Sequence, residues 1–283
     1  MHSECLKLQV SEACNNNCWF CKNPSIEIKQ IQEALDAEGL AKGQRLVISA
    51  REPTLYKGLP ILVKKAFSLF EMIEVNTNGR MLAVPAFLKE FKPFQKKLVF
   101  NVSLHASRRD IHDFLTRTED SWIQSVKGLL DLASAGFDTK VSTVLTKCND
   151  SNLKSMPFLL KRLKASKWKI MLFEPAGLGK DNFFMLMPHH LILQDALTEI
   201  IESASKTGMA LELRNIPFCF LAEGQLGKAL VKNPVGIVPR IKAESCSTCC
   251  FNEKCAGFYE RYFKEFRIEP GHALSPLKEG GGE

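Results

Sequence analysis

The stretch Ala13-Cys14-Asn15-Asn16-Asn17-Cys18-Trp19-Phe20-Cys21 carries three cysteines with C-x3-C-x2-C spacing. It follows an alternating apolar run at residues 6–10, a pattern that predicts a β-strand. Three thiolates this close together can ligate one face of a metal cluster, whereas a structural zinc site needs a fourth ligand and a [4Fe-4S] cluster normally takes four cysteines. An iron–sulfur cluster on Cys14, Cys18 and Cys21 would therefore leave one iron open to a non-protein ligand.

The chain downstream of the cysteines alternates between strand and helix patterns. Glycines at the ends of several segments suit helix caps or turns. Strands are expected at residues 5–10, 45–49, 72–76, 98–104, 138–145, 168–174 and 210–214, and helices at 28–39, 59–70, 84–91, 121–135, 153–165, 188–206 and 256–266. This alternation predicts an α/β fold in which helices cover a parallel sheet. Periodicity alone does not distinguish an open sheet from a barrel.

The cysteine motif resembles the signature of the radical SAM superfamily, C-x3-C-x-aromatic-C, with Phe20 at the aromatic position. The resemblance implies that the three thiolates hold a [4Fe-4S] cluster whose open iron chelates S-adenosylmethionine. It also implies a partial (β/α)6 TIM-like barrel over residues 1–207, with the active site at the C-terminal ends of the strands. A redox-inert cysteine cluster, or part of a zinc site, is the alternative that the residues leave open.

A second motif follows the strand at residues 45–49. Ala50-Arg51-Glu52-Pro53 resembles the Gly-Gly-Glu-Pro motif that binds the amino group of S-adenosylmethionine, with Glu52 and Pro53 retained. Glycines let the backbone approach a ligand closely, so Arg51 must turn its side chain away or find a partner of its own. The alternative for Glu52 is a surface carboxylate in a turn.

Further cofactor contacts are implied at the ends of later strands. Asn78 lies in a turn that resembles the family's Thr-Asn-Gly, and Ser103 matches a serine that bonds the carboxylate or ribose of S-adenosylmethionine. By the same resemblance Ser142 or Val144 lies beside the adenosyl group, and the loop at Gly177 contacts adenine through its backbone. On the strand at 98–104, Ser103 shares one face with Asn101 and His105, as a polar barrel lumen would require.

A second group of cysteines lies near the C-terminus. The spacing Cys246-x2-Cys249-x5-Cys255 resembles the auxiliary-cluster region of SPASM and twitch extensions, and Cys219 supplies a fourth thiolate for a second [4Fe-4S] cluster. We assign residues 208–270 to this extension, which is too short for two extra clusters, and 271–283 to a flexible tail. A structural zinc site on the same four cysteines, Cys250 in place of Cys249, and an open site without Cys219 are the alternatives.

Composition narrows the class further. The chain has 283 residues, ten cysteines and a net charge of +7. No export signal or membrane-length apolar run is apparent, so the clustered cysteines favour metal ligation in a reducing cytoplasm over disulfides. The densest basic run comprises Lys161, Arg162, Lys164, Lys167 and Lys169, which suits either a solvated helix end or attraction of an acidic or phosphate-bearing substrate.

The resemblance implies an enzyme that reductively cleaves S-adenosylmethionine to a 5'-deoxyadenosyl radical, which abstracts hydrogen from a peptide or small metabolite. An electron donor such as flavodoxin or ferredoxin is expected as a partner, and the second cluster would aid electron transfer or substrate binding. The alternatives are a non-catalytic iron–sulfur electron carrier, a zinc-stabilised nucleic-acid-binding protein, and a radical SAM enzyme that modifies nucleic acid. No concentrated Lys/Arg–aromatic surface supports nucleic-acid binding.

Overall fold

The computed structural model of the protein describes residues 5–10, 12–22, 45–222, 224–225, 227–232 and 238–266. The helix expected at 28–39 and the tail at 271–283 lie outside these residues. The strands are β1 (Cys5–Gln9), β2 (Arg45–Ser49), β3 (Met72–Thr77), β4 (Leu98–Ser103), β5 (Asp138–Leu145), β6 (Lys167–Leu172), β7 (Leu211–Arg214), β8 (Leu230–Lys232), β9 (Arg240–Ile241) and β10 (Phe258–Tyr259). The helices are α2 (Leu59–Leu69), α3 (Pro85–Lys89), α4 (Arg109–Thr116), α5 (Ser121–Ala135), α6 (Met156–Arg162), α7 (Leu178–Asp181), α8 (Phe183–Leu186), α9 (His190–Thr207) and α10 (Glu260–Phe266).

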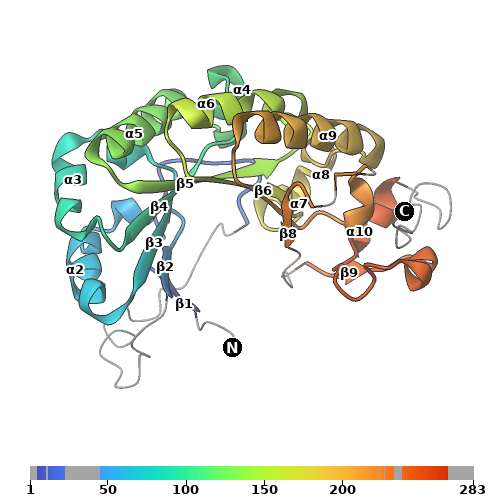
Figure 1. Cartoon of the computed structure of the whole chain (residues 1–283), viewed down its shortest axis with the longest axis horizontal. Coiled ribbons are helices and arrows are strands. Elements are labelled where there is room, and N and C mark those ends of the chain that lie inside the picture. The colour runs from blue at the N-terminus through green and yellow to red at the C-terminus, as the bar shows by residue number, and fades with distance from the viewer. Residues whose placement is uncertain are drawn as a thin grey trace.

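Eight parallel strands form one sheet in the order of the chain, from β1 to β8. The sheet is arched, and α2 to α6 and α9 lie along its convex side (Figure 1). The predicted α/β fold is therefore confirmed, and a partial barrel is consistent with it. The sheet continues past the six strands expected for the barrel, because β7 pairs with β6 and β8 pairs with β7. The strand β8 was not predicted, and the division of the chain at residue 207 stays a prediction.

Strand β6 illustrates how the sheet sorts its side chains. Trp168, Ile170 and Leu172 alternate with Lys167, Lys169 and Met171, and the apolar set is buried beneath the helices. Trp168 is fully buried, and its indole N–H donates to Thr143 Oγ1 on β5 at 2.9 Å. The other set therefore faces the concave side of the sheet, where a ligand has room.

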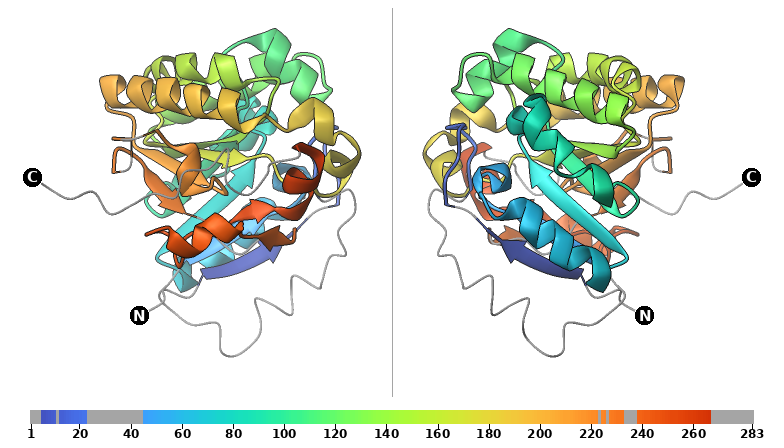
Figure 2. Two further views of the ribbon diagram at one scale, coloured as in Figure 1. Left: turned by 90° about the vertical axis from the view of Figure 1, so that its right-hand side faces the viewer. Right: turned by 90° about the vertical axis from the view of Figure 1, so that its left-hand side faces the viewer.

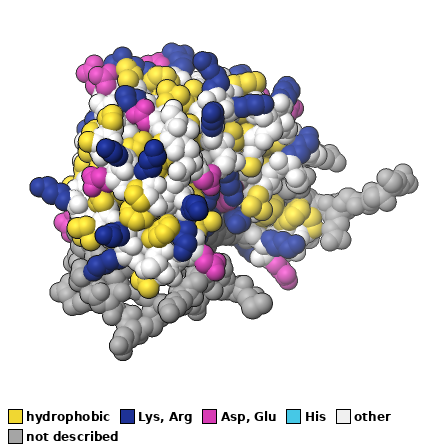
Figure 3. All heavy atoms as spheres, turned by 60° about the vertical axis from the view of Figure 1, so that its left-hand side comes forward, with side chains coloured by type: hydrophobic (Ala, Val, Ile, Leu, Met, Phe, Trp, Pro, Cys, Tyr) yellow, Lys and Arg dark blue, Asp and Glu magenta, His cyan; other side chains and the backbone are white. Residues whose placement is uncertain are grey.

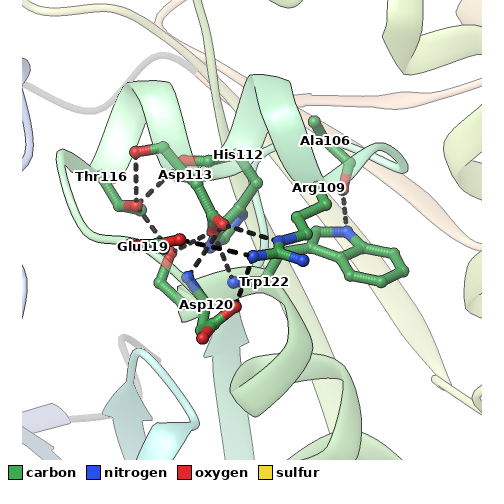
Figure 4. A network of polar contacts seen from close by, with 9 residues as sticks. Ala106, Arg109, His112, Asp113, Thr116, Glu119, Asp120 and Trp122 are labelled. Carbon is green, nitrogen blue, oxygen red and sulfur yellow. Dashed lines mark hydrogen bonds and ion pairs between the residues drawn. The ribbon is translucent and has the colours of Figure 1, made fainter.

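Helix α4 is joined to α5 by a polar network centred on Asp113 (Figure 4). Asp113 Oδ1 accepts the backbone N–H of Trp122 and the hydroxyl of Ser121, each at 2.8 Å, and Asp113 Oδ2 accepts the backbone N–H of Asp120 at 3.0 Å. A carboxylate at this position satisfies the unpaired N–H groups that begin α5. Helix α5 begins at Ser121, and Asp113 of the preceding helix provides its cap.

Two expected helices are shorter than the apolar pattern suggested. The segment 84–91 forms a helix only at Pro85–Lys89, and the segment 153–165 begins as a 3₁₀ turn that becomes helical at Met156. In both cases a proline lies in the first turn, where its missing N–H is tolerated. None of the helices within the described ranges is long and apolar enough to cross a membrane.

The C-terminal segment lies on the side of the sheet opposite the layer of α5, α6 and α9 (Figures 1 and 2). The helix expected at 256–266 is corrected, because Phe258–Tyr259 pairs with Arg240–Ile241 in an antiparallel ribbon and α10 begins only at Glu260. Gly257 has φ +76°, and a Cβ there would lie 2.3 Å from the carbonyl oxygen of Ile241. A helix cannot form through this position. The aromatic side chains Phe258 and Tyr262 of the segment are buried and pack against Phe220.

Candidate active site

A cavity of about 320 Å³ opens at the C-terminal ends of the strands. The N-terminal cysteine loop forms one wall, the residues after β2 form another, and β4 to β6 form the floor. Its lining residues include Cys14, Cys18, Phe20, Cys21, Lys22, Ala50, Arg51, Ser103, His105, Ser142, Val144 and Met171. The structure therefore brings the three cysteines together with Phe20, Ser103 and Ser142. Glu52, Pro53, Asn78 and Gly177 are not among the lining residues.

The three thiols are partly buried and free of disulfides. Burial, with smaller contributions from the thiols of Cys14 and Cys21, raises the pKa of Cys18 to about 12. Burial also raises the pKa of Cys14, although the Asn16 N–H donates to its sulfur at 3.4 Å. Thiols in such surroundings stay protonated until a metal displaces the proton. Three thiols at the edge of one cavity fit a [4Fe-4S] cluster with one iron facing the cavity.

The cysteine loop is attached to the C-terminal end of α4. The Asn17 N–H donates to the Thr116 carbonyl at 3.0 Å, and the Trp19 N–H donates to the Leu115 carbonyl at 3.1 Å. The guanidinium of Arg117 lies over the Trp19 ring, 4.0 Å from its centroid. These contacts use carbonyls that a helix leaves unpaired at its end. Arg117 thus contributes to the packing of the loop.

Arg80 connects the cysteine loop to α5. It lies in the turn after β3, and its Nη1 donates to the Asn15 carbonyl and, at 2.9 Å, to Asn16 Oδ1. Its Nε donates to Gln124 Oε1 at 2.6 Å. Asn78 adds a parallel contact, because its Nδ2 donates to Asn15 Oδ1 at 2.6 Å. Asn78 therefore contacts the loop that carries the cysteines.

Glu52 is fully buried, and both oxygens of its carboxylate accept hydrogen bonds from the protein. Oε1 accepts the N–H of Thr54 at 3.0 Å and the hydroxyls of Thr54 and Thr77, each at 2.6 Å. Oε2 accepts the N–H of Asn78 at 2.7 Å, and the Glu52 N–H donates to the Ala13 carbonyl at 3.0 Å. The side chain joins the ends of β2 and β3 beneath the cysteine loop. Pro53, buried beside it, begins a short 3₁₀ turn.

Ala50 and Arg51, which replace the glycines of the motif, border the cavity directly. The charge of Arg51 also acts on Cys14, where it partly offsets the rise in the thiol pKa. The retained Glu52 therefore supports the loop from behind, and the altered positions face the cavity. Contact between Glu52 and the cofactor stays a prediction.

The polar residues predicted on β4 and β5 form a connected row. Ser142 Oγ donates to Asn101 Oδ1 at 2.8 Å, and Asn101 Nδ2 donates to Asn76 Oδ1 at 2.7 Å. Ser103 pairs with Ser142 in the sheet register, and both line the cavity. These side chains give the floor hydrogen-bonding groups for a polar ligand.

His105 also borders the cavity, and its ring meets Phe20 edge-on at a centroid distance of 4.7 Å. The Val144 N–H donates to His105 Nδ1 at 3.3 Å, which leaves the proton on Nε2. Burial, and to a lesser extent His112, lowers the His105 pKa well below its ordinary value. His105 is thus a neutral side chain at pH 7. The backbone N–H of His105 donates to His112 Nδ1 at 3.0 Å. The sequence alone did not identify His112, because its role depends on this contact.

Gly177 lies behind the cysteine loop. It has φ +54°, and a Cβ there would lie 2.4 Å from the Lys22 carbonyl oxygen and 2.5 Å from that of Cys21. The next residue, Leu178, donates its N–H to the Cys21 carbonyl at 2.9 Å. An ion pair between Lys22 and the buried Glu174 makes a second connection between the two segments. The structure thus places Gly177 against the ligand loop.

The second group of cysteines also comes together in the fold. Burial, followed by the nearby thiols of Cys255, Cys246 and Cys249, raises the pKa of Cys219 to about 12. Cys250 is exposed. The Gly257 N–H donates to Cys255 Sγ at 3.4 Å, and Phe218 stacks on Phe251 with ring centroids 4.6 Å apart. Among the described residues, no three Cys, His, Asp or Glu side chains are grouped as one metal ion would require.

With the fold and the cavity in place, comparison with known proteins assigns the family. The model of the Radical SAM superfamily matches residues 8–158. The chain belongs to the radical SAM superfamily, whose members use a [4Fe-4S] cluster and S-adenosylmethionine. The resemblance inferred from the cysteine motif is thereby confirmed, whereas the SPASM or twitch character of the C-terminal region stays a prediction.

Two curated relatives are probable GTP 3',8-cyclases. The protein of Metallosphaera sedula is 24% identical over 215 residues, which are 72% of this chain and 65% of the relative. The protein of Thermoplasma volcanium is 26% identical over 259 residues, 86% of this chain and 74% of the relative. The match therefore spans slightly less than two thirds of the Metallosphaera protein.

Among solved structures, Streptococcus suis SuiB bound to the precursor peptide SuiA superposes with a TM-score of 0.66. The alignment is 13% identical and covers 97% of this chain and 75% of SuiB. SuiB has also been solved with S-adenosylmethionine bound. Because the two sequences are only 13% identical, the structural similarity to SuiB establishes the fold alone.

Proposed function

We propose that this chain is a radical SAM enzyme that removes a hydrogen atom from a peptide or small metabolite bound in the cavity. The observation that carries the proposal is the convergence of Cys14, Cys18 and Cys21 with a polar strand floor at one cavity. The bound cluster and S-adenosylmethionine supply the radical chemistry, and the protein supplies ligation, orientation and exclusion of water.

Each wall of the cavity has a part in this proposal. The three thiolates hold the cluster, and Ser103 and Ser142 offer hydrogen bonds to the polar groups of the cofactor. Phe20 and the neutral ring of His105 form an apolar wall that admits a flat, uncharged group and excludes water. A radical requires such a dry cavity, because solvent and oxygen compete for it.

Two substrate classes are suggested by relatives. The curated relatives carry names that refer to GTP, a small metabolite. The structure of SuiB carries a precursor peptide. Both classes fall within the proposal. An external one-electron donor such as flavodoxin or ferredoxin completes it.

We assign the second thiol group, Cys219, Cys246, Cys249 and Cys255, to a closed second [4Fe-4S] cluster. The assignment is supported by the other three thiols, which lie close enough to Cys219 to raise its pKa. All ten cysteines are free, which suits a reducing compartment such as the cytoplasm. On the face shown in Figure 3, lysines and arginines are interspersed with acidic and apolar side chains and form no continuous basic surface. That face gives the nucleic-acid alternative no support.

The proposal is tested on protein purified and reconstituted without oxygen. Iron, sulfide and 5'-deoxyadenosine released from S-adenosylmethionine with dithionite are measured for the wild type and for Cys14→Ala/Cys18→Ala/Cys21→Ala. We expect release by the wild type, and loss of about four irons together with all release in the triple variant. Cys5→Ala, at an exposed cysteine that belongs to neither group, is the control. Release that survives the triple substitution would contradict the proposal.

A further inference from the structure

Below the cavity, the concave face of the sheet carries a row of charged side chains. Strand register pairs Ser142 of β5 with Lys169 of β6, and Lys169 with Glu212 of β7. Met171 lies two residues after Lys169, on the same face of β6, and lines the cavity together with Ser142. Lys169 is therefore one step deeper than the cavity floor.

Two carboxylates on this face already have full sets of cationic partners. Glu74 on β3 is 2% exposed and pairs with Arg45 and, at 3.0 Å, with Lys140. On the other side of the row the carboxylate of Glu212, also 2% exposed, pairs with two cations, Lys167 and Arg214.

Lys169 lies between these two clusters, and the charges of both carboxylates act on it. Within the described part of the chain its ammonium makes no hydrogen bond and no ion pair within 4.0 Å. Burial lowers its pKa to about 8, although Glu74 and Glu212 act in the opposite direction. A partly buried charge without a counterion is costly, and proteins keep such groups mainly where they have a task.

We propose that Lys169 binds an oxyanion of the substrate, a carboxylate or a phosphate, at the inner end of the cavity. This inference rests on the proposed function, since it assigns part of the substrate of the same site. The cysteine loop and β4 hold the cofactor near the mouth, and Lys169 would hold the anionic end of the substrate deeper in the sheet. Ser142, which lines the cavity, is the register neighbour of Lys169 on β5 and so connects the cavity floor to Lys169.

The charge pattern favours an anion over the alternatives. A cationic or apolar substrate group would give Lys169 no direct ion pair, and the two carboxylates already form ion pairs with other cations. The basic run noted in the sequence is also divided by the fold. Lys161 and Arg162 end α6 and are exposed, whereas Lys167 and Lys169 face the concave side. The second part of the run therefore lies on the face of the sheet that also carries the cavity floor.

The test measures binding of two probes to the reconstituted protein with S-adenosylmethionine present, by calorimetry without oxygen. The probes are inorganic tripolyphosphate and tricarballylate, which separate a phosphate site from a carboxylate site. Lys169→Met removes the charge at similar volume, Lys169→Arg keeps it, and Lys161→Met removes an exposed charge on α6. Iron content and 5'-deoxyadenosine release are measured for each variant as separate readouts.

We expect at least one probe to bind the wild type and Lys161→Met equally, and to bind Lys169→Met about tenfold more weakly. Lys169→Arg should restore most of the binding. The probe that binds more tightly identifies the oxyanion. The inference is overturned if neither probe binds, or if Lys169→Met binds as the wild type does. The proposed function fails separately, through absent iron or absent 5'-deoxyadenosine release.

Discussion

Glu52 is a residue whose motif suggests contact with a ligand, whereas its surroundings give it another task. Its carboxylate accepts all of its hydrogen bonds from Thr54, Thr77 and Asn78. Burial raises its pKa, and these donors counteract the rise. These contacts give Glu52 a structural role, because they fix the backbone at the ends of β2 and β3.

We expect Glu52→Gln to lower the free energy of unfolding by about 1–3 kcal/mol, because the amide nitrogen would face a donor and leave it unsatisfied. Urea unfolding without oxygen measures the change, and Glu71→Gln, at an exposed position, is the control. A variant of native stability with a raised KM for S-adenosylmethionine would instead show that the carboxylate contacts the cofactor.

Lys169 makes a second prediction at the scale of one residue. Its folded pKa is about 8, below the ordinary 10.5, so the unfolded chain binds more protons between these values. Stability conferred at this position therefore rises with pH across that interval. We expect Lys169→Met to be more stable than the wild type at about pH 7, and the difference to shrink at about pH 9.5. Comparing the two proteins cancels the thiols that titrate in both, and a difference independent of pH would contradict the expectation.

At the scale of elements, the cysteine loop is held from three sides. The end of α4 accepts its backbone N–H groups, Arg80 joins it to α5, and the segment after β6 packs behind it at Gly177. Short ligand loops have little core of their own. The geometry of the three thiols therefore depends on these neighbours.

Arg80→Met should weaken the loop without altering a ligand. Loss of the charged hydrogen bonds to Asn15, Asn16 and Gln124 is expected to speed the release of iron to a chelator about tenfold. Arg108→Met is the matched control, since Arg108 is an exposed arginine whose ion pair is with Asp110. Equal release rates for the two variants would show that Arg80 does not position the loop.

Gly177→Ala tests the third contact. Its positive φ and the 2.4 Å approach to the Lys22 carbonyl combine backbone strain with a clash. Gly208, at the end of α9, has φ +68° and nothing within 4 Å of its Cβ position. We expect Gly208→Ala to cost about 1 kcal/mol of stability and to keep its iron, whereas Gly177→Ala should also lose iron from the first cluster. Iron analysis and thermal unfolding of both variants decide the matter.

The strands and the thiol groups could be predicted because their signals are local. The alternation on β4 to β6 and the spacing of Cys14, Cys18 and Cys21 are complete within a few residues. The partners of Arg80 lie 44 to 65 residues away, so no local pattern contains them. The ribbon at Phe258–Tyr259 was read as helix for the same reason, since its pairing partner at Arg240–Ile241 is distant in sequence.

At the scale of the molecule, the chain presents two thiol groups on one scaffold. The first follows β1. In the second, Cys219 lies between β7 and β8, and Cys246, Cys249 and Cys255 come after β8, the last strand of the sheet. The segment that follows β6 interacts with both regions. Glu174 pairs with Lys22 of the first loop, and its charge also acts on Tyr259 of the C-terminal ribbon. A second cluster here would be built onto the sheet that holds the first, as a route for electrons would require.

The C-terminal thiols provide the test of that arrangement. We expect about eight irons per wild-type chain and about four in Cys219→Ala/Cys255→Ala, since the remaining thiols cannot close a cluster. Cys250→Ala is the control, because this exposed cysteine is adjacent to Cys249 and is not expected to be a ligand. Release of 5'-deoxyadenosine should persist in the double variant, since the first cluster is untouched. A wild type with about four irons and one zinc would make the second site structural, and equal loss of iron in Cys250→Ala would move the ligand from Cys249 to its neighbour.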